Sequence, residues 1–200
     1  MPALISSLLK KLIAPVFRNW HRGTIAEQRA RQEKMARFDV LPPGINSEPF
    51  QIGALAAEWV RPDDPAGTIL YLHGGAYALG SIKTHRMLAA ALAKSTGMQV
   101  LLIAYRLAPE APFPAGLEDV VNAYLWLLED GIPPQEIVIA GDSAGGGLAL
   151  AALLSMRDAM LPWRSTLMQR KSRKWSILSE PLRKIAENEY QNVIIIFSRP

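Results

Sequence analysis

Three short apolar segments, separated by helical ones, constrain the fold of this chain more than any other feature. They are TILYL (68–72), VLLIAY (100–105) and EIVIA (136–140). Helical patterns lie between them and after the last one, at 83–95, 116–131 and 144–157. Strands that are apolar on both sides are typical of a parallel sheet covered by helices on both faces. The sequence therefore predicts an α/β fold with a mostly parallel sheet.

The composition is that of one soluble globular domain. Half of the 200 residues are apolar and one fifth are charged, which is enough apolar surface for a core of two or three layers. The chain has no cysteine, so disulfides, thiolate metal ligands and a cysteine nucleophile are excluded. We expect a cytoplasmic protein with no metal and no cofactor.

The formal charge of +4 is unevenly distributed along the chain. Residues 1–160 hold 14 Lys and Arg against 15 Asp and Glu, whereas residues 161–200 hold 8 against 3. The basic character belongs to the tail, so a nucleic-acid-binding face is not expected on the main body. The hypothesis that the tail binds nucleic acid or acidic membranes has only this charge to support it. All 14 glycines precede residue 161. We predict a helical N-terminal cap segment (1–40), a core (41–160) and an unrelated basic tail (161–200).

The first twenty residues, MPALISSLLKKLIAPVFRNW, form an amphipathic pattern. Lys10 and Lys11 interrupt the apolar run and no small-residue cleavage site follows, unlike a signal peptide. A helix packed on the protein is favoured over one lying on a membrane surface. The longest later apolar run, near 148–154, is far shorter than the ~20 residues that cross a bilayer. No membrane span is predicted.

The segment GDSAGGGLAL (141–150) places Ser143 between Gly141 and Gly145, where a strand gives way to a helix. A serine nucleophile must be raised on a sharp turn, and small residues two positions away on each side permit that turn. A helix beginning at Ala144 points free N–H groups toward developing negative charge. A simple helix cap is the alternative. A phosphate-binding loop is disfavoured, because neither G-x-G-x-x-G nor a following Gly-Lys-Ser/Thr is present.

A second glycine turn, HGGAYALGS (73–81), follows the strand TILYL directly. Backbone N–H groups at Gly74 and Gly75, together with that of Ala144, suit an oxyanion hole. His73 starts this loop, and we predict that its ring anchors the turn rather than acting as a base.

The order HGGAYALGS, YRLAPEAPFPAGLEDV, GDSAGGGLAL resembles the hormone-sensitive-lipase-like branch of the α/β-hydrolase carboxylesterases, over about residues 40–160. Ala76 replaces the third glycine of the family's first motif. The resemblance implies hydrolysis of short or medium acyl esters, with Ser143 attacking the carbonyl and a cap that helps to bind the acyl chain. It also implies structural roles for Tyr105 and Arg106, and loop and helix contacts for Glu110 and Asp119.

A serine hydrolase of this fold takes its acid and its base from residues after the serine. The three histidines, His21, His73 and His85, all precede Ser143. The carboxylates after Ser143 are Asp158, at the end of the following helix, and Glu180, Glu187 and Glu189, in the tail. We therefore expect an incomplete triad and little or no activity, most simply through a frameshift, insertion or rearrangement near Leu161. The alternative is a non-catalytic protein of the same fold that binds a small ligand.

The strand EIVIA would be left with an open edge if the sheet ended there, which favours aggregation. NVIIIFS (192–198) is a candidate for covering that edge, after a right-handed crossover through residues 179–190.

Overall fold

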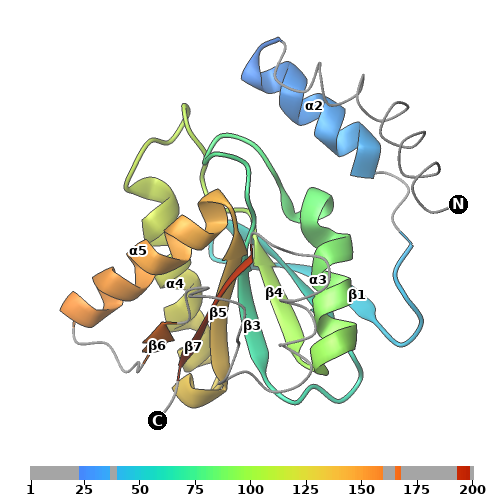
Figure 1. Ribbon diagram of the computed structural model, residues 1–200, viewed down its shortest axis with the longest axis vertical. Coiled ribbons are helices and arrows are strands. Elements are labelled where there is room, and N and C mark those ends of the chain that lie inside the picture. Colours follow the sequence, from blue (N-terminus) through green and yellow to red (C-terminus); the bar gives the residue numbers. More distant parts are fainter. Residues whose placement is uncertain (1–22, 37–39, 160–164, 168–192, 199–200) are drawn as a thin grey trace, which may run out of the picture.

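A computed structural model describes residues 23–36, 40–159, 165–167 and 193–198 (Figure 1). Its α-helices are α2 (Ile25–Met35), α3 (Ile82–Thr96), α4 (Ala115–Glu129) and α5 (Ala144–Asp158), with a short 3-10 helix at Pro134–Glu136. Its strands are β1 (Asn46–Ile52), β2 (Leu55–Arg61), β3 (Thr68–Leu72), β4 (Gln99–Ile103), β5 (Ile137–Asp142), β6 (Ser165–Leu167) and β7 (Val193–Ser198).

The strands form one sheet in the order β1-β2-β4-β3-β5-β7-β6. Its centre is parallel, because β3 pairs in parallel with β4 on one side and with β5 on the other. The pairings outside these three strands are antiparallel. The α/β class is confirmed, with a mixed sheet that is parallel in its middle.

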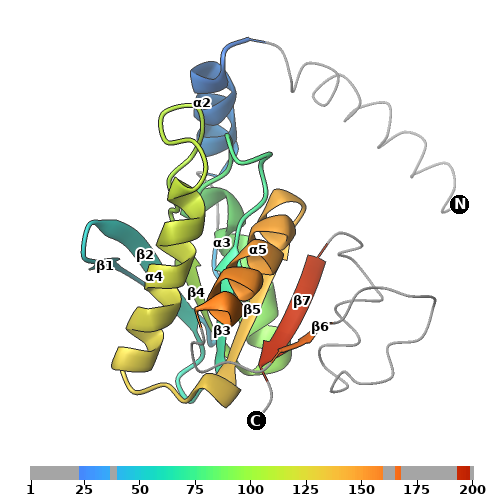
Figure 2. The same cartoon turned by 90° about the vertical axis from the view of Figure 1, so that its left-hand side faces the viewer.

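Helices cover both faces of the sheet: α3 lies on one side, and α4 and α5 lie on the other (Figures 1 and 2). The alternation of side chains along β3 shows why the strand is apolar throughout. Leu70 and Leu72 pack in the cluster that contains α4 and α5 residues, whereas Ile69 and Tyr71 pack in the cluster that contains α3 residues. Each face of the strand thus has a helical layer to bury it.

The helix α3 has clear start and stop signals. Ser81 and Thr84 form a capping box, in which each side chain bonds the other residue's backbone N–H. Gly97 ends the helix with a φ of 71°, the left-handed conformation that glycine adopts without a steric penalty. These signals fix the first residue of α3 directly after the loop 73–81.

The buried face of α4 differs in detail from the pattern of its apolar residues. The fully buried residues of its central part are Val120, Ala123, Tyr124 and Leu127. Three other apolar residues, Val121, Leu125 and Leu128, are only partly buried. The buried face thus includes the small Ala123, which belongs to the same core cluster as residues of α5.

The strand β7 covers the edge of β5, but not by the predicted route. It pairs antiparallel with β5, so that Val193 lies opposite Asp142 and Phe197 opposite Val138. A right-handed crossover would have given a parallel pairing, so that part of the prediction is wrong. An antiparallel neighbour needs no crossover helix over the sheet. Residues 179–190 lie outside the described part of the chain.

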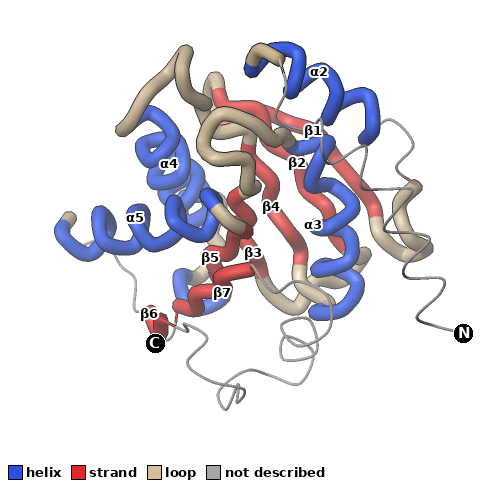
Figure 3. Tube along the Cα trace, turned by 45° about the horizontal axis from the view of Figure 1, so that its top comes forward, coloured by secondary structure: helices blue, strands red, loops and turns tan. Residues whose placement is uncertain are grey.

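The helix α2 is the described part of the predicted cap segment, and it lies against the start of α3 rather than on a face of the sheet (Figures 1 and 3). It has no buried residue, so it is held by polar contacts. Arg29 donates from Nε to Ala78 O at 2.8 Å and from a terminal nitrogen to Ala108 O at 2.9 Å, and it pairs with Glu110 at 2.9 Å. Gln32 Oε1 accepts from Gly80 N at 3.1 Å. Among the described helices, none is long and apolar enough to cross a membrane.

Candidate active site

Ser143 stands at a sharp turn between β5 and α5, with φ 49° and ψ −118°. Such a positive φ is strained for a residue with a side chain. The side chain is exposed and makes no capping hydrogen bond, which argues against the helix-cap interpretation. A Cβ at Gly141 would lie 2.6 Å from Leu72 O, and a Cβ at Gly145 only 1.9 Å from the same atom. Both glycines are therefore required by the close packing of this turn against the end of β3.

The loop 73–81 also contains strained backbone. Gly75 has φ 130°, and a Cβ there would lie 2.2 Å from Leu79 O. Ala76 and Tyr77 have φ of 53° and 60°, in the left-handed region. Alanine pays a steric penalty there that the glycine of the family motif would not have. The backbone at Ala76 is therefore strained by its side chain.

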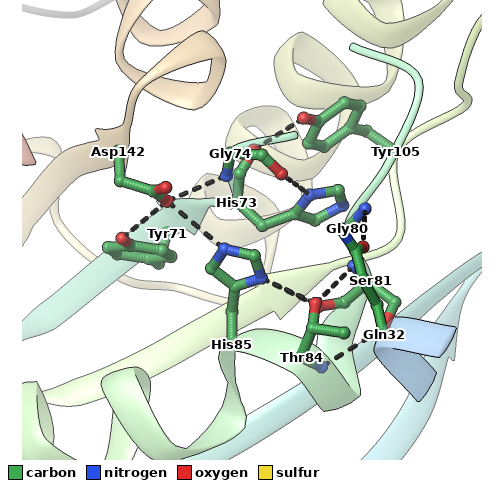
Figure 4. Close-up of polar contacts among 10 residues, drawn as sticks. All are labelled: Gln32, Tyr71, His73, Gly74, Gly80, Ser81, Thr84, His85, Tyr105 and Asp142. Carbon is green, nitrogen blue, oxygen red and sulfur yellow. Dashed lines mark hydrogen bonds and ion pairs between the residues drawn. The ribbon is translucent and has the colours of Figure 1, made fainter. Parts of the chain in front are cut away.

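Asp142 links the two turns (Figure 4). Its Oδ1 accepts from Gly74 N at 2.8 Å and from the Tyr71 hydroxyl at 2.9 Å, and His85 Nε2 lies 3.6 Å from the same oxygen. Burial acts to raise the pKa of the Asp142 carboxyl, but His85, Tyr71 and the Gly74 N–H together hold that pKa below its ordinary value. The charged carboxylate thus fixes the glycine loop beside Ser143.

This linking role was not anticipated from the sequence. The only available signal was position: an acidic residue stands directly before the serine, where nothing in the strand-turn-helix pattern requires one. The bond from Gly74 also bears on the predicted oxyanion hole. In this structure the Gly74 N–H is occupied by Asp142, whereas Gly75 and Ala76 have no acceptor for their N–H groups within the described part of the chain.

His73 is a structural residue, as predicted. It is 1% exposed, and its ring stacks on Tyr105 with centroids 4.3 Å apart. Its Nδ1 lies 2.9 Å from Gly74 O, and its own carbonyl accepts from the Tyr105 hydroxyl at 2.6 Å. Burial lowers the pKa of His73 to about 4, so the ring is neutral at pH 7. The Tyr105 contact confirms the structural role expected for that residue.

His85 faces the same cavity as Ser143, but both of its ring nitrogens are engaged. Nε2 is directed at Asp142, and Nδ1 lies 2.8 Å from Thr84 Oγ1 (Figure 4). A general base must offer a free nitrogen within hydrogen-bond reach of the serine. In this arrangement each ring nitrogen of His85 already has a polar neighbour other than Ser143.

The contacts expected for the two remaining carboxylates are also present. Arg106 Nε donates to Asp119 Oδ1 at 2.9 Å, which ties the segment after β4 to α4. Glu110 pairs with Arg29 of α2. These groups hold loops in place and do not reach the cavity at Ser143.

A cavity of about 630 Å³ opens in front of Ser143. Its walls come from α2, the loop 73–81, α3 and the elbow, and they include Gln32, Met35, Gly75, Ala76, His85 and Met87. The N–H of Ala144, the first residue of α5, has no acceptor inside the helix. The structure thus places Ser143, Gly74 and Gly75 in the lining of one cavity, with the first residue of α5 directly after Ser143, and α2 contributes to the same wall.

Relatives with similar sequences include proteins named acetyl-hydrolase and esterase. The chain is 50% identical over 152 residues to an acetyl-hydrolase of Streptomyces hygroscopicus, covering 72% of this chain and 49% of that protein. It is 36% identical over 127 residues to an esterase of Acinetobacter venetianus, covering 63% of this chain and 42% of the other. The chain thus spans about half the length of the curated relatives it matches, or less.

Solved structures agree in fold. A crystal structure of an esterase from the bacterial hormone-sensitive lipase family superposes with a TM-score of 0.67 at 43% identity, over 70% of this chain and 48% of that one. EstE5 with PMSF gives a TM-score of 0.70 at 42% identity, over 81% and 55%. The sequence matches the alpha/beta hydrolase fold family over residues 69–190. This match, the strand-turn-helix at Ser143 and the sheet beneath it establish that the chain belongs to the α/β-hydrolase fold family.

Proposed function

We propose that this chain carries the nucleophile and oxyanion hole of a carboxylic-ester hydrolase. The observation that carries the proposal is the exposed Ser143 at φ 49°, at the mouth of a cavity whose wall includes Gly75 and Ala76. Strained backbone conformations persist only where the surrounding structure holds them in place, and they cluster at catalytic sites. Relatives named acetyl-hydrolase and esterase support an ester as the substrate class.

In the proposed reaction Ser143 Oγ attacks the carbonyl carbon of the ester and gives up its proton to a base. The carbonyl electrons move to oxygen, and the resulting oxyanion accepts hydrogen bonds from backbone N–H groups. The alcohol then leaves with a proton, and water hydrolyses the acyl-serine. Preorganised donors of this kind contribute about 3 to 4 kcal/mol each to the transition state.

The oxyanion-hole donors can be assigned from the backbone N–H groups that have no acceptor in the described chain. Gly75 and Ala144 remain the predicted donors, and the Ala76 N–H joins them because it lies on the same cavity wall without an acceptor in the described chain. Gly74 has a different role in this proposal: its bond to Asp142 holds the loop at the correct distance from the elbow. The helix α2 supplies Gln32 and Met35 to the cavity, which supports the predicted contribution of the cap to acyl binding.

No histidine follows Ser143 in the 200 residues of the chain, and the ring nitrogens of His85 are engaged. We expect this polypeptide to hydrolyse p-nitrophenyl butyrate barely above background, since loss of a triad member leaves only a residual acceleration of about 10³ to 10⁴ over water. Ser143→Ala should then change the rate little. A robust turnover that depends on Ser143 would mean that His85, His21 or a second copy supplies the base.

A second candidate function is the binding of a small apolar ligand without turnover. It is favoured by the engaged nitrogens of His85 beside a formed cavity of about 630 Å³. A cooperative melting transition that short-chain esters raise, with no product released, would support it. Release of alcohol at a rate lost in Ser143→Ala would contradict it.

A further inference from the structure

The face of α2 that lies toward the rest of the protein is mostly polar. Its partly buried residues recur at spacings of three and four, so they form one stripe along the helix. They are Ile25, Gln28, Arg29, Gln32, Glu33 and Ala36. A helix that only covers a core carries large apolar side chains on such a stripe. The polar side chains therefore indicate that α2 makes directed contacts with specific groups of the protein.

Arg29 is connected to the proposed oxyanion-hole donors through a single residue. Its Nε donates to Ala78 O at 2.8 Å, and Ala78 N donates in turn to Gly75 O at 3.0 Å. Leu79 N donates to the same Gly75 oxygen at 2.8 Å. Gly75 is one of the proposed donors, and the next residue, Ala76, is another. The guanidinium of Arg29 thus stands two hydrogen bonds away from the donor residues.

The same guanidinium reaches this loop by a second route. A terminal nitrogen of Arg29 donates to Ala108 O at 2.9 Å, and Ala108 N donates to Tyr77 O at 2.9 Å. One route therefore ends at Ala78 and the other at Tyr77, which are neighbours in the chain. A planar guanidinium carries several N–H donors at fixed angles, so it can hold two carbonyl oxygens in a defined relative position.

The backbone between these contacts and Gly75 needs support. Ala76 and Tyr77 have φ of 53° and 60°, and residues with side chains persist in this region only where the surrounding structure holds them. The ion pair of Arg29 with Glu110 supplies little of that support, because the two side chains are 27% and 64% exposed. The bonds from Arg29 to the two carbonyl oxygens are therefore the contacts of α2 that bear on the loop.

We propose, on the basis of the function proposed above, that Arg29 is a positioning residue for the oxyanion hole. Its guanidinium fixes residues 76–78, so that the N–H groups of Gly75 and Ala76 stay within reach of the oxyanion formed at Ser143. Arg29 acts through the backbone and does not contact the ester. The helix α2 thus contributes to the reaction itself, in addition to lining the cavity.

Saturation labelling of the intact chain with a small fluorophosphonate separates this role from a role in substrate binding. Arg29→Met should lower the maximal labelling rate of Ser143 about tenfold, because misplaced donors stabilise the transition state less well. The half-saturating concentration should change less than about twofold, since the donors act on the transition state rather than on binding. A higher half-saturating concentration with an unchanged maximal rate would overturn the proposal.

Two further variants identify the contacts responsible. Glu110→Gln removes the charged partner of Arg29 but leaves its bonds to the two carbonyl oxygens, so the maximal labelling rate should stay nearly unchanged. Arg29→Ala leaves space for a guanidinium ion. Methylguanidinium, at concentrations far below those that unfold proteins, should therefore restore labelling several-fold, whereas sodium chloride at the same ionic strength should not. An equal loss in Glu110→Gln, or no rescue by methylguanidinium, would contradict the positioning role.

Amide hydrogen exchange separates this inference from the proposed function, because it needs no reactive serine. In Arg29→Met the N–H groups of Ala78 and Leu79 should exchange about tenfold faster than in the native chain, while those of β4 should be unchanged. If Ser143 proves unreactive and this change appears, the hydrolase function fails and the positioning of the loop by Arg29 stands. If Ser143 is reactive and Arg29→Met alters neither its labelling nor the exchange, the function stands and the role of Arg29 is excluded.

Discussion

The centre of the sheet and the junction at its carboxyl edge are built on opposite principles. In β3, β4 and β5 the buried side chains are almost all apolar, and the regular parallel pairings satisfy the backbone. At the junction, formed by residues 73–81 and 141–145, a buried histidine and a half-buried carboxylate hold the loops together. All three non-glycine residues with positive φ in the described chain, Ala76, Tyr77 and Ser143, lie there. The regular core supplies the stability that keeps this strained geometry in place.

The largest expected effect comes from Gly145→Ala. Its Cβ would lie 1.9 Å from Leu72 O, and the atoms in conflict belong to the backbone of β3 and cannot move aside. We expect a loss of about 4 kcal/mol in the free energy of unfolding measured with urea, at the upper end for single substitutions. The control is Gly53→Ala, at φ 60° with nothing within 4 Å of the added Cβ, which should cost only about 1 kcal/mol. Similar losses for the two variants would show that packing at the elbow is loose.

The next largest loss in the free energy of unfolding is expected from breaking the ion pair that joins α3 to the sheet. Glu58 is 3% exposed and accepts from Arg86 at 2.5 and 2.7 Å. Burial acts to raise the pKa of Glu58, but the Arg86 and Ser47 hydrogen bonds hold it below its ordinary value. Arg86→Met leaves a buried carboxylate without this partner, at a cost of about 3 kcal/mol at pH 7.

Because the folded-state pKa of Glu58 is lowered, its contribution is present above the unfolded-state pKa and is lost as the pH falls through the folded-state value. The difference between the native chain and Arg86→Met should therefore narrow at acid pH. Arg61→Met, which removes an exposed pair with Glu48, should change the free energy of unfolding by less than about 1 kcal/mol. A difference for Arg86→Met that does not depend on pH would contradict this assignment.

A smaller change in the free energy of unfolding is expected from the protonation of His73, in the junction. With a folded-state pKa of about 4 against 6.5 for the free side chain, the unfolded chain binds a proton first as the pH falls. The contribution of His73 is complete above pH 6.5 and declines toward pH 4, by on the order of 2 kcal/mol between pH 7 and pH 5. An NMR titration of its ring protons should give a midpoint near 4. A midpoint near 6.5 would show that the ring is accessible to solvent.

Relief of the backbone strain at Ser143 should increase the free energy of unfolding. Ser143→Gly removes the Cβ from a residue at φ 49° and should raise the free energy of unfolding by about 1 kcal/mol. Ser143→Ala keeps the Cβ and should leave it nearly unchanged. Equal stability of the two variants in urea would mean that the turn at Ser143 stores no strain.

The smallest change in the free energy of unfolding is expected at Ala76, where the family's motif has glycine. Ala76→Gly restores glycine at φ 53° and should add about 0.5 to 1 kcal/mol, read as a higher urea midpoint with an unchanged slope. Ala78→Gly is the matched control in the same loop, because Ala78 has no positive φ, and it should not stabilise. A loss of stability in Ala76→Gly would show that the methyl group packs usefully in the cavity wall.

Local sequence predicted the regular elements well. The run TILYL is β3 to the residue, α3 and α5 begin within one residue of expectation, and the two glycines around Ser143 have the packing reason expected for them. The contacts that unite the junction were not predicted. Asp142 reaches Gly74 and Tyr71 across about seventy positions of chain, and the antiparallel direction of β7 is set by a pairing across more than fifty positions. Periodicity reports which face of an element is buried, and it carries no information about such partners.

Reactivity of Ser143 toward a fluorophosphonate tests the central claim most directly. Attack by Oγ forms a phosphorus–oxygen bond and expels fluoride, and the hydroxyl proton passes to solvent water. Peptide mass spectrometry after labelling of the intact chain identifies the modified residue and gives its labelling rate. We predict that Ser143 is labelled well before Ser95, an exposed serine in the last turn of α3, in the native chain. Urea should abolish the difference, because the N–H donors are then no longer held beside the Ser143 hydroxyl. Equal labelling of Ser143 and Ser95 in the native chain, or a preference that survives in urea, would contradict it.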